Sequence, residues 1–331
     1  MIRCGSRSFH TASLVLPGRV RRPAYALYAF CRLADDAVDE EGARGAADRL
    51  ARRLARLAEG RPTDHPADRA FAATLRRHAI PPAIPAALIE GLAWDEQGRR
   101  YETLADLEAY AARVAATVGV MMTLIMGERR EAVLARAAAL GVAMQLSNIA
   151  RDVGEDAANG RLYLPRGWMR AEGIDPDAFL AAPAHSPALG RVVNRLLARA
   201  ETLYDAALPG IAALPRDCRG GIAAARAMYR EIGRTVGARG GNGVDARAVV
   251  SGQRKLTLLA GAMIGWGLPR FASAAPAAPE GLESCAFLVE TVARADAASP
   301  AARALEDRLA RALDLFVAAS LHISDPARRP Y

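Results

Sequence analysis

The sequence predicts an all-α protein built as a helical bundle. Hydrophobic residues make up 52% of the 331 residues and aromatic residues only 5%, while Ala, Leu and Arg are abundant. These three residues favour helices, and apolar residues recur at the three- and four-residue steps of amphipathic helices. We find no segment that alternates apolar and polar residues as a half-buried strand does. A chain of this length can bury a large core.

The helices in the first half of the chain have recognisable boundaries. Pro23 stands near the start of the first helix, a position that tolerates a missing backbone N–H. Thr103 and Asp106 have the spacing of a capping box. We predict helices over Pro23–Glu41, Ala47–Ala58, Ala67–His78, a segment through Gly91 to about Arg99, Thr103–Met126 and Glu131–Asp152.

The second half begins with Gly154–Trp168, a segment rich in Gly, Asn and Asp that we interpret as an ordered loop near a functional site. A Pro- and Ala-rich stretch at 272–279 is the best linker candidate. We therefore expect one domain over residues 1–271 and a helical appendage over residues 280–331, packed on the same domain. Further helices are predicted over Pro187–Ala213, Asp217–Val236, Asp245–Gly265, Leu282–Ala297 and Pro300–Leu321.

The formal net charge of +8 comes almost wholly from arginine, because Lys255 is the only lysine. Such a balance suits anionic ligands such as diphosphates, or an acidic membrane surface. Nucleic acid is not expected as a partner, since no basic patch with interleaved aromatic residues and no zinc-finger or RNA-recognition motif is found. Much of the charge is explained by arginines on solvated helix faces.

Cysteine and histidine usage indicates a reduced, cytoplasmic protein without a zinc site. The four cysteines have no Cys-x-x-Cys spacing and follow no secretory signal, and the five histidines cluster with neither cysteines nor one another. The longest apolar runs, Val114–Gly127 and Leu256–Pro269, are shorter than the roughly 18–20 residues of a membrane-spanning helix. The sequence therefore predicts a soluble or peripheral protein.

Three pairs of aspartates share the spacing Asp-x-x-x-Asp: Asp35/Asp39, Asp64/Asp68 and Asp152/Asp156. On a helix, side chains at i and i+4 emerge on one face about 5–6 Å apart, so each pair brings two like charges together. A divalent metal ion would offset the repulsion. About one such spacing is expected by chance, and the middle pair spans Pro66, which breaks or starts a helix. We expect the middle pair to be accidental.

The first pair belongs to a helical stripe that also carries Tyr28 and Arg32. A guanidinium beside metal-bound carboxylates suits a phosphate group, which it binds through two parallel hydrogen bonds. The alternative is a solvated helix face on which Arg32 and Asp35 form an ion pair. The stripe alone does not decide between these two interpretations.

The second pair repeats the pattern with neutral amides, since Gln145 and Asn148 lie on the same stripe as Asp152 and Asp156, and Arg151 is adjacent. Mg²⁺ prefers oxygen ligands and takes only one or two carboxylates together with substrate phosphate and water. A solvated helix end explains Asp156, but it does not explain a polar stripe within an apolar helix. We therefore predict a divided metal site that binds diphosphate groups.

A hydrocarbon attached to such a diphosphate needs an apolar slot. The small residues of Val114–Gly119 offer one. Close packing between two helices is an equally compatible interpretation of the same residues.

Longer motifs in the chain resemble the squalene/phytoene synthase family. They are SRSFHTASLVLP, YALYAFCRLADDAVDE, GLAWDEQGRRYETL, QLSNIARDVGEDAANGRLYLP and RAVVSGQRKL, and the resemblance extends to about Leu259. It implies an isoprenoid synthase-type helical bundle with a central cavity, with the catalytic domain in residues 1–271. The implied reaction joins two geranylgeranyl diphosphates head to head through prephytoene diphosphate to phytoene, with inorganic diphosphate as a product. Mg²⁺, or Mn²⁺ in its place, would be required, and NADPH would not.

The same resemblance assigns roles to individual residues by their match to the family motifs. Tyr110 and Tyr163 would lie beside the reacting carbons, where an aromatic face suits a carbocation. The metal ligands would be Asp35, Asp39, Asn148, Asp152 and Asp156. The diphosphates would contact Ser6, Ser8, Tyr28, Arg32, Gln145 and Arg151, with Tyr229, Arg247 and, as a further candidate, Lys255 closing that end of the site.

Three other functions remain open. The first is a C30 synthase that takes two farnesyl diphosphates, of the dehydrosqualene or hydroxysqualene type. The second is a non-catalytic relative, although such a protein is expected to lose acidic ligands that this chain keeps. The third is an Mg²⁺-dependent hydrolase, which would need a base for water. The charge and the last helices also lead us to expect peripheral contact with the inner face of the membrane.

Overall fold

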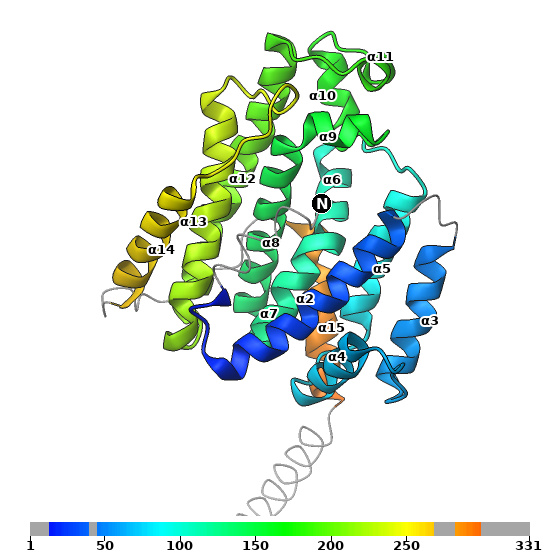
Figure 1. Ribbon diagram of the computed structural model, residues 1–331, viewed down its shortest axis with the longest axis vertical. Coiled ribbons are helices and arrows are strands. Elements are labelled where there is room, and N and C mark those ends of the chain that lie inside the picture. Colours follow the sequence, from blue (N-terminus) through cyan, green and yellow to red (C-terminus); the bar gives the residue numbers. More distant parts are fainter. Residues whose placement is uncertain (1–12, 40–44, 268–281, 299–331) are drawn as a thin grey trace, which may run out of the picture.

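The computed structural model describes residues 13–39, 45–267 and 282–298, and within these ranges it contains helices and no strands (Figure 1). The predicted fold class is therefore confirmed. The helices are α2 (Gly18–Asp39), α3 (Ala46–Ala58), α4 (Pro66–Arg77), α5 (Ala83–Glu96), α6 (Leu104–Ala111), η1 (Ala112–Ala116), α7 (Thr117–Ile125), α8 (Glu131–Arg151), α9 (Val153–Ala158), α10 (Arg166–Ala171), α11 (Pro176–Ala181), α12 (Pro187–Ala213), α13 (Arg216–Ala238), α14 (Gly252–Gly267), η3 (Glu283–Cys285) and α15 (Ala286–Ala297).

The helix predicted over 103–126 is one continuous rod with a π-helical interruption. Thr103 caps its start, and Thr103 and Asp106 exchange both hydrogen bonds of the capping box. The π-helical segment η1 follows Tyr110 after one residue and contains the first of the small residues predicted at Val114–Gly119. Such single-turn π segments are common at functional sites because the extra residue per turn redirects the side chains on either side.

Three predicted boundaries were wrong. The first helix begins at Gly18, so Pro23 lies inside it, and the backbone N–H groups of Val20 and Arg21 bond to the carbonyl of Pro17. The segment 154–168, predicted as a loop, contains α9 and the start of α10. Residues 245–251, predicted as helix, form a connection before α14. Local composition misled us there, because Asn242 starts a turn in which its side-chain oxygen accepts hydrogen bonds from two backbone N–H groups.

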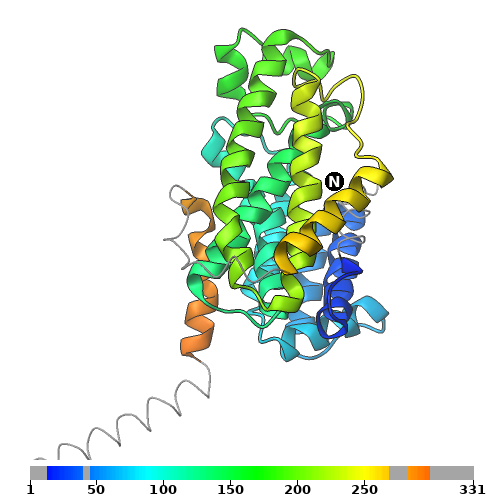
Figure 2. The same cartoon turned by 90° about the vertical axis from the view of Figure 1, so that its left-hand side faces the viewer.

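Helix α8 is the core of the bundle, surrounded by α7, α12 and α13 (Figures 1 and 2). Glycines allow the close approach of α8 to the rod before it. A Cβ on Gly119 would lie 2.6 Å from the carbonyl oxygen of Ala137, and a Cβ on Gly141 would lie 2.6 Å from that of Ala115. Two segments, Leu104–Ile125 and Glu131–Arg151, are long and apolar enough to span a membrane, but 67% and 78% of their apolar windows are buried inside the bundle.

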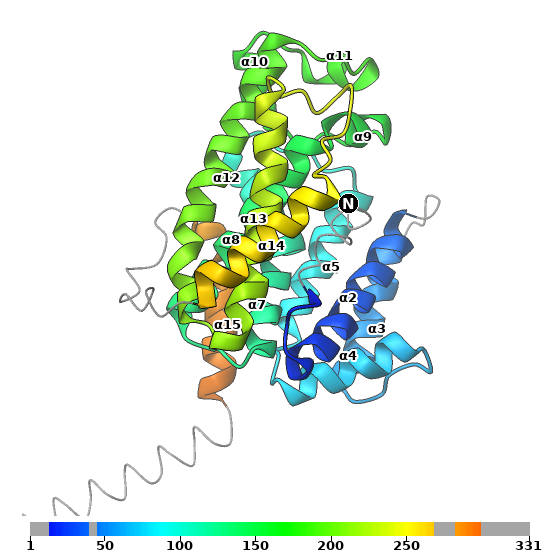
Figure 3. The same cartoon turned by 60° about the vertical axis from the view of Figure 1, so that its left-hand side comes forward.

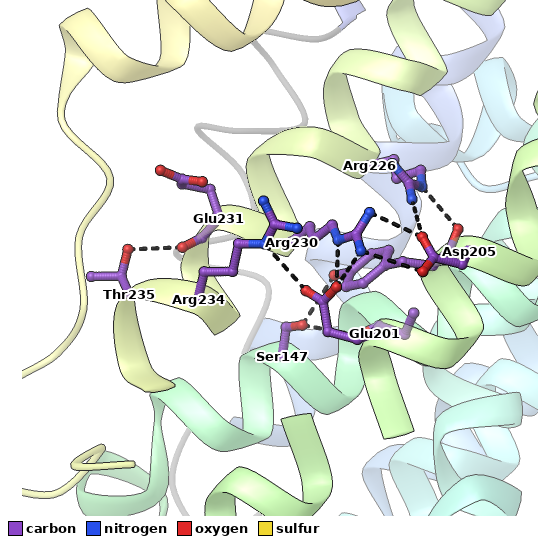
Figure 4. Close-up of polar contacts among 10 residues, drawn as sticks. Ser147, Glu201, Asp205, Arg226, Arg230, Glu231, Arg234 and Thr235 are labelled. Carbon is purple, nitrogen blue, oxygen red and sulfur yellow. Dashed lines mark hydrogen bonds and ion pairs between the residues drawn. The ribbon is translucent and has the colours of Figure 1, made fainter. Parts of the chain in front are cut away.

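Ion pairs and hydrogen bonds between α12 and α13 hold the outer side of α8 in place (Figure 4). The Ser147 hydroxyl on α8 lies 3.0 Å from the Tyr204 hydroxyl on α12. Arg226 donates to the carbonyl oxygen of Tyr204 at 2.8 Å, and Arg230 pairs with Glu201. Because Ser147 precedes Asn148, this network fixes the rotation of α8 beside a predicted metal ligand.

Helix α14 crosses the outer face of α13 (Figure 3). On the opposite side of the bundle, α15 packs against α5 and α8, and Asp296 pairs with Arg129 at 2.5 Å. The described part of the predicted appendage therefore contacts the main bundle. The predicted linker 272–279 and the predicted helix Pro300–Leu321 lie outside the described residues.

Candidate active site

A cavity runs between α2, α5, the α6–α7 rod, α8, α12 and α13. Most of its wall is apolar, including Leu88, Leu92, Met122, Met126, Leu140 and Ile211. Val133 and Asn148 both line it from α8, fifteen residues apart, so the cavity follows roughly 22 Å of that helix. Its polar lining residues are Ser13, Tyr28, Asp35, Asp95, Tyr110, Thr123, Arg136, Gln145, Asn148, Arg161, Tyr163 and Tyr229.

The small residues predicted to form a slot have both of the roles that we considered. Val114, Ala115, Val118 and Gly119 line the cavity. Gly119 also provides the close contact with α8 described above. Helix packing and the apolar wall therefore depend on the same residues.

On α2, the structure brings Tyr28 and Asp35 to the cavity wall, where Asp35 is buried. Arg32 does not line the cavity, because its Nε donates a hydrogen bond of 2.8 Å to Asp36 on a half-exposed face. Neither interpretation of the stripe anticipated this i,i+4 partner. Asp39 is the last residue of α2 and its side chain lies outside the described residues, as do Ser6 and Ser8.

The second acidic pair lies where α8 gives way to α9. Helix α8 ends at Arg151, Asp152 connects the two helices, and the N–H of Asp156 donates to the carbonyl of Asp152 at 2.8 Å. One turn therefore survives across the junction, and the two carboxylates stay within electrostatic range although only Asp156 lies on α9. Asn148 and Gln145, about one and two turns before Asp152, line the cavity.

Two arginines hold the Asp152 carboxylate. Arg151 donates to both of its oxygens at 2.7 and 2.5 Å, and both side chains are only 3% exposed. Arg247 reaches the same carboxylate from the connection before α14, with its Nε 2.9 Å from Asp152 and its Nη1 2.9 Å from Glu155. A buried carboxylate with two guanidinium groups is a place where negatively charged diphosphate could be bound.

Glycines press the connection 239–251 against the α8–α9 junction. The N–H of Gly154 donates to the carbonyl of Gly243 at 3.0 Å. A Cβ on Gly154 would lie 2.4 Å from the oxygen of Val244, and a Cβ on Gly243 would lie 2.2 Å from the oxygen of Ala150. These two contacts bring Arg247 to Asp152. The other basic candidate, Lys255, is half-buried on α14 and does not line the cavity.

Two oxygens at this junction suit a cation. Oδ2 of Asp156 and Oδ1 of Asn148 are buried and have no hydrogen-bond partner among the described residues. Burial, and next the charge of Asp152, raise the pKa of Asp156 well above its ordinary value. A divalent cation would satisfy both oxygens and favour the ionised carboxylate. The described residues contain no group of three or more Asp, Glu, His or Cys side chains that could hold a metal ion by themselves.

Tyr110 and Tyr163 meet at the cavity wall, and they share a partner that we missed. Their hydroxyls donate to the two oxygens of Asp95 at 2.8 and 2.7 Å, and their rings stack with centroids 5.1 Å apart. Arg161 also lines the cavity. Both missed residues lie inside the motifs quoted above, but neither belongs to a repeated spacing that would have drawn attention to it.

Asp64/Asp68 does not contribute to the site. Asp68 is fully buried, accepts two hydrogen bonds from Arg53 at 2.9 and 2.7 Å, and also bonds to Thr63. The His65 side chain caps the start of α4, with Pro66 as its first residue. Asp68 therefore joins α3 to α4, whereas Asp64 is exposed and lies 3.9 Å from Arg69.

Comparison with known proteins agrees with this arrangement. The family model for squalene/phytoene synthase matches residues 2–255. The chain belongs to the squalene/phytoene synthase family. Members with similar sequences include the phytoene synthase of Rhodobacter capsulatus, 54% identical over 264 residues (78% of each chain), and that of Cereibacter sphaeroides, 48% identical over 309 residues (89% of this chain and 86% of the other). The chain is therefore a prenyltransferase of this family.

Solved structures of the family share the fold. A crystal structure of a dehydrosqualene synthase in complex with ligand matches with a TM-score of 0.74 and 33% identity, over 80% of this chain and 93% of that one. The squalene synthase HpnC from Alicyclobacillus acidocaldarius matches with a TM-score of 0.65 and 28% identity, over 70% and 88% of the two chains. The isoprenoid synthase-type bundle predicted from the sequence is thus confirmed.

Proposed function

We propose that this protein condenses two molecules of geranylgeranyl diphosphate to phytoene through prephytoene diphosphate. The observation that carries the proposal is the layout of the cavity: a polar end formed by Asp35, Gln145 and Asn148, one to two helical turns before the α8–α9 junction, continues into an apolar wall along α8. Roughly 22 Å of helix is comparable to an extended C20 prenyl chain. The names of two similar sequences, both phytoene synthases, support the same substrate.

In this proposal some residues bind the metal ions and the diphosphates, and others surround the reacting carbons. Asp35, Asp39, Asn148, Asp152 and Asp156 would hold Mg²⁺, which when bound neutralises the charge of the leaving diphosphates. Arg151, Arg247, Gln145, Tyr28 and Tyr229 would orient the diphosphates, together with Ser6, Ser8 and Arg32. The apolar wall excludes water from the allylic cation, and Tyr110 and Tyr163 present aromatic faces to it.

The reaction balances without a reducing cofactor. Each half-reaction breaks one carbon–oxygen bond, allylic in the first and next to the cyclopropane ring in the second, and each releases one diphosphate and loses one proton. The first forms the cyclopropane of prephytoene diphosphate, and the second rearranges it to the central double bond of phytoene. No hydride is needed, so we expect no NADPH requirement.

A C30 reaction is the second candidate, because the dehydrosqualene synthase structure is similar to this one. The purified protein should be incubated with Mg²⁺ and with either geranylgeranyl or farnesyl diphosphate, with and without NADPH. We expect phytoene from the C20 substrate, no effect of NADPH, loss of product with a chelator and recovery with Mg²⁺ or Mn²⁺. A C30 hydrocarbon from farnesyl diphosphate, with no product from the C20 substrate, would contradict the proposal.

We also propose a cytoplasmic location with peripheral contact to an acidic membrane. The charge of +8 and the lipid product support this proposal, as do Leu256 and Ile264, which are 64% and 69% exposed on α14. Sedimentation with anionic liposomes at low salt should exceed sedimentation with neutral ones. Equal recovery in the supernatant with both kinds of liposome would rule the contact out.

A further inference from the structure

The carboxylate of Asp95 joins two aromatic residues of the cavity. It extends from the last turn of α5, and its Oδ2 accepts from Tyr110 at 2.8 Å while its Oδ1 accepts from Tyr163 at 2.7 Å. All three side chains line the cavity. Tyr101 packs against both tyrosines, with ring centroids 5.3 and 6.0 Å away, but its hydroxyl has no hydrogen-bond partner among the described residues. Asp95 therefore holds the two phenols that face the cavity and not the third.

The surroundings of Asp95 keep it more basic than an ordinary aspartate. Burial raises its pKa to about 6, although the hydrogen bonds from Tyr163 and Tyr110 and the charge of Arg161 lower it. The negative charge of Asp35 raises it further. A carboxylate of this kind is ionised at neutral pH and is still able to take up a proton, which is the balance that a general base needs.

Asp95 also lies within electrostatic reach of both acidic sites. Asp35 on α2 raises the pKa of Asp95, and Asp95 in turn contributes to the raised pKa of Asp156 on α9. Other charged or titratable groups that interact with it are Arg161 and the phenols of Tyr101, Tyr110 and Tyr163. A cation formed where a diphosphate leaves the metal ligands would therefore be close to this carboxylate.

We propose that Asp95 is the proton acceptor of the condensation and receives the proton through the hydroxyl of Tyr110 or Tyr163. This inference rests on the proposed function. As a C–H bond of the carbocation breaks, its electron pair forms the new carbon–carbon bond of the cyclopropane or of the product double bond. The phenol oxygen takes up the proton and its own proton moves to Asp95. The carboxyl returns the proton to water when product leaves.

If Asp95 is the proton acceptor, its removal should stop loss of the proton but not ionisation of the carbon–oxygen bond. If its role is merely structural, its removal should slow both events together. Ionisation of the allylic carbon–oxygen bond needs no base, so it continues when the base is removed. A cation that cannot lose its proton is captured by water as an alcohol. The ratio of diphosphate released to hydrocarbon formed, which is two for the complete reaction, therefore reports directly on proton removal.

The test compares Asp95→Asn with the wild type, using whichever allylic diphosphate the wild type converts. We expect kcat for hydrocarbon to fall about 10²–10⁴-fold, with prenyl alcohols formed and a diphosphate-to-hydrocarbon ratio above two. The acid limb of the wild-type profile, where kcat falls below about pH 6 as Asp95 becomes protonated, should be lost. Tyr101→Phe is the matched control, because it removes the phenol that Asp95 does not hold, and it should keep the wild-type kcat and ratio.

Two results would overturn the proposal. One is an Asp95→Asn kcat within about threefold of the wild type. The other is a large loss of kcat with the diphosphate-to-hydrocarbon ratio still at two, which would make Asp95 a positioning residue.

If Asp95→Asn does not give a folded helical protein, the double variant Tyr110→Phe/Tyr163→Phe takes its place. It keeps both rings and should show the same raised ratio, and a ratio of two would overturn the proposal. A wild type that converts only farnesyl diphosphate would contradict the proposed C20 substrate, but the ratio could still be measured.

Discussion

The two halves of the acidic site share a sequence spacing but differ in how the protein supports them. The α2 half lies within one continuous helix, and its arginine, Arg32, pairs with Asp36 on a half-exposed face. The other half lies at a junction between two helices, where Asp152 is buried between Arg151 and Arg247. In the first half the helix alone places the carboxylate. In the second half, helix α8, helix α9 and the connection 239–251 all have to meet for Asp152 and Arg247 to pair.

This difference indicates which half depends on the fold. A carboxylate on an unbroken helix keeps its position as long as that helix is packed. Asp152 depends in addition on the contacts of Gly154 and Gly243 that bring Arg247 to it. We therefore expect substitutions in the second half to lower both the activity and the free energy of unfolding. Substitutions in the first half should lower the activity alone.

The largest effects are expected from the two aspartates themselves. Asp35→Ala and Asp152→Ala should each lower kcat/KM at least about 10³-fold, because each removes a metal ligand. Asp152→Ala should also lower the free energy of unfolding by about 3–5 kcal/mol, because it removes the buried carboxylate that pairs with the buried Arg151. Asp35→Ala should change the free energy of unfolding by less than about 1 kcal/mol, because Asp35 lines the cavity and its negative charge repels that of Asp95.

Steady-state kinetics and urea unfolding measure both quantities, and retained helical circular dichroism is the control for folding. Equal losses of stability in the two variants would remove the distinction between the halves. Near-normal activity in either variant would contradict its assignment as a metal ligand.

An intermediate effect is expected from Gly154→Ala. The new methyl group would lie 2.4 Å from the oxygen of Val244 and would push the connection 239–251 away from the junction. We expect a loss of about 1–3 kcal/mol in unfolding free energy and a fall of about 10–100-fold in kcat/KM, because Arg247 moves away from the diphosphate end. Arg247→Met should reproduce the kinetic loss with little loss of stability.

Gly261→Ala is the matched control, since no atom lies within 4 Å of its added Cβ. In the middle of α14, that substitution should stabilise the protein by up to about 1 kcal/mol and leave the kinetics unchanged. If Gly154→Ala and Gly261→Ala behave alike, the close contact at the junction has no role in placing Arg247.

The smallest effect is expected from Arg32→Gln. Its ion pair with Asp36 is partly exposed, so the free energy of unfolding should change by less than about 1 kcal/mol. If Arg32 turns to the diphosphate when substrate binds, KM should rise about tenfold. Asp36→Asn serves as the control and should leave KM unchanged, because Asp36 only holds the resting position of Arg32. An unchanged KM in Arg32→Gln would show that this arginine has no contact with substrate.

Much of the fold and part of the site could be predicted from the sequence. The capping box at Thr103 and Asp106, the bounds of α12 and the polar stripe of Gln145 and Asn148 follow from helical periodicity and local hydrogen bonding, which act over a few residues. Asp95 could not be assigned in this way. Its partners are 15 and 68 positions away in the chain, and no local pattern encodes such a contact.

The sequence by itself determined that this protein is helical, that two aspartate pairs fall on helical stripes and that a third pair spans a proline that breaks or starts a helix. Only the tertiary structure decided that Asp68 is a buried partner of Arg53, that Arg247 reaches Asp152 and that Asp95 joins Tyr110 to Tyr163. The physical reason is the distance along the chain over which each interaction acts. Helix periodicity and capping depend on neighbours within about one turn, whereas the pairing of a buried charge depends on which distant segments the packed core brings together.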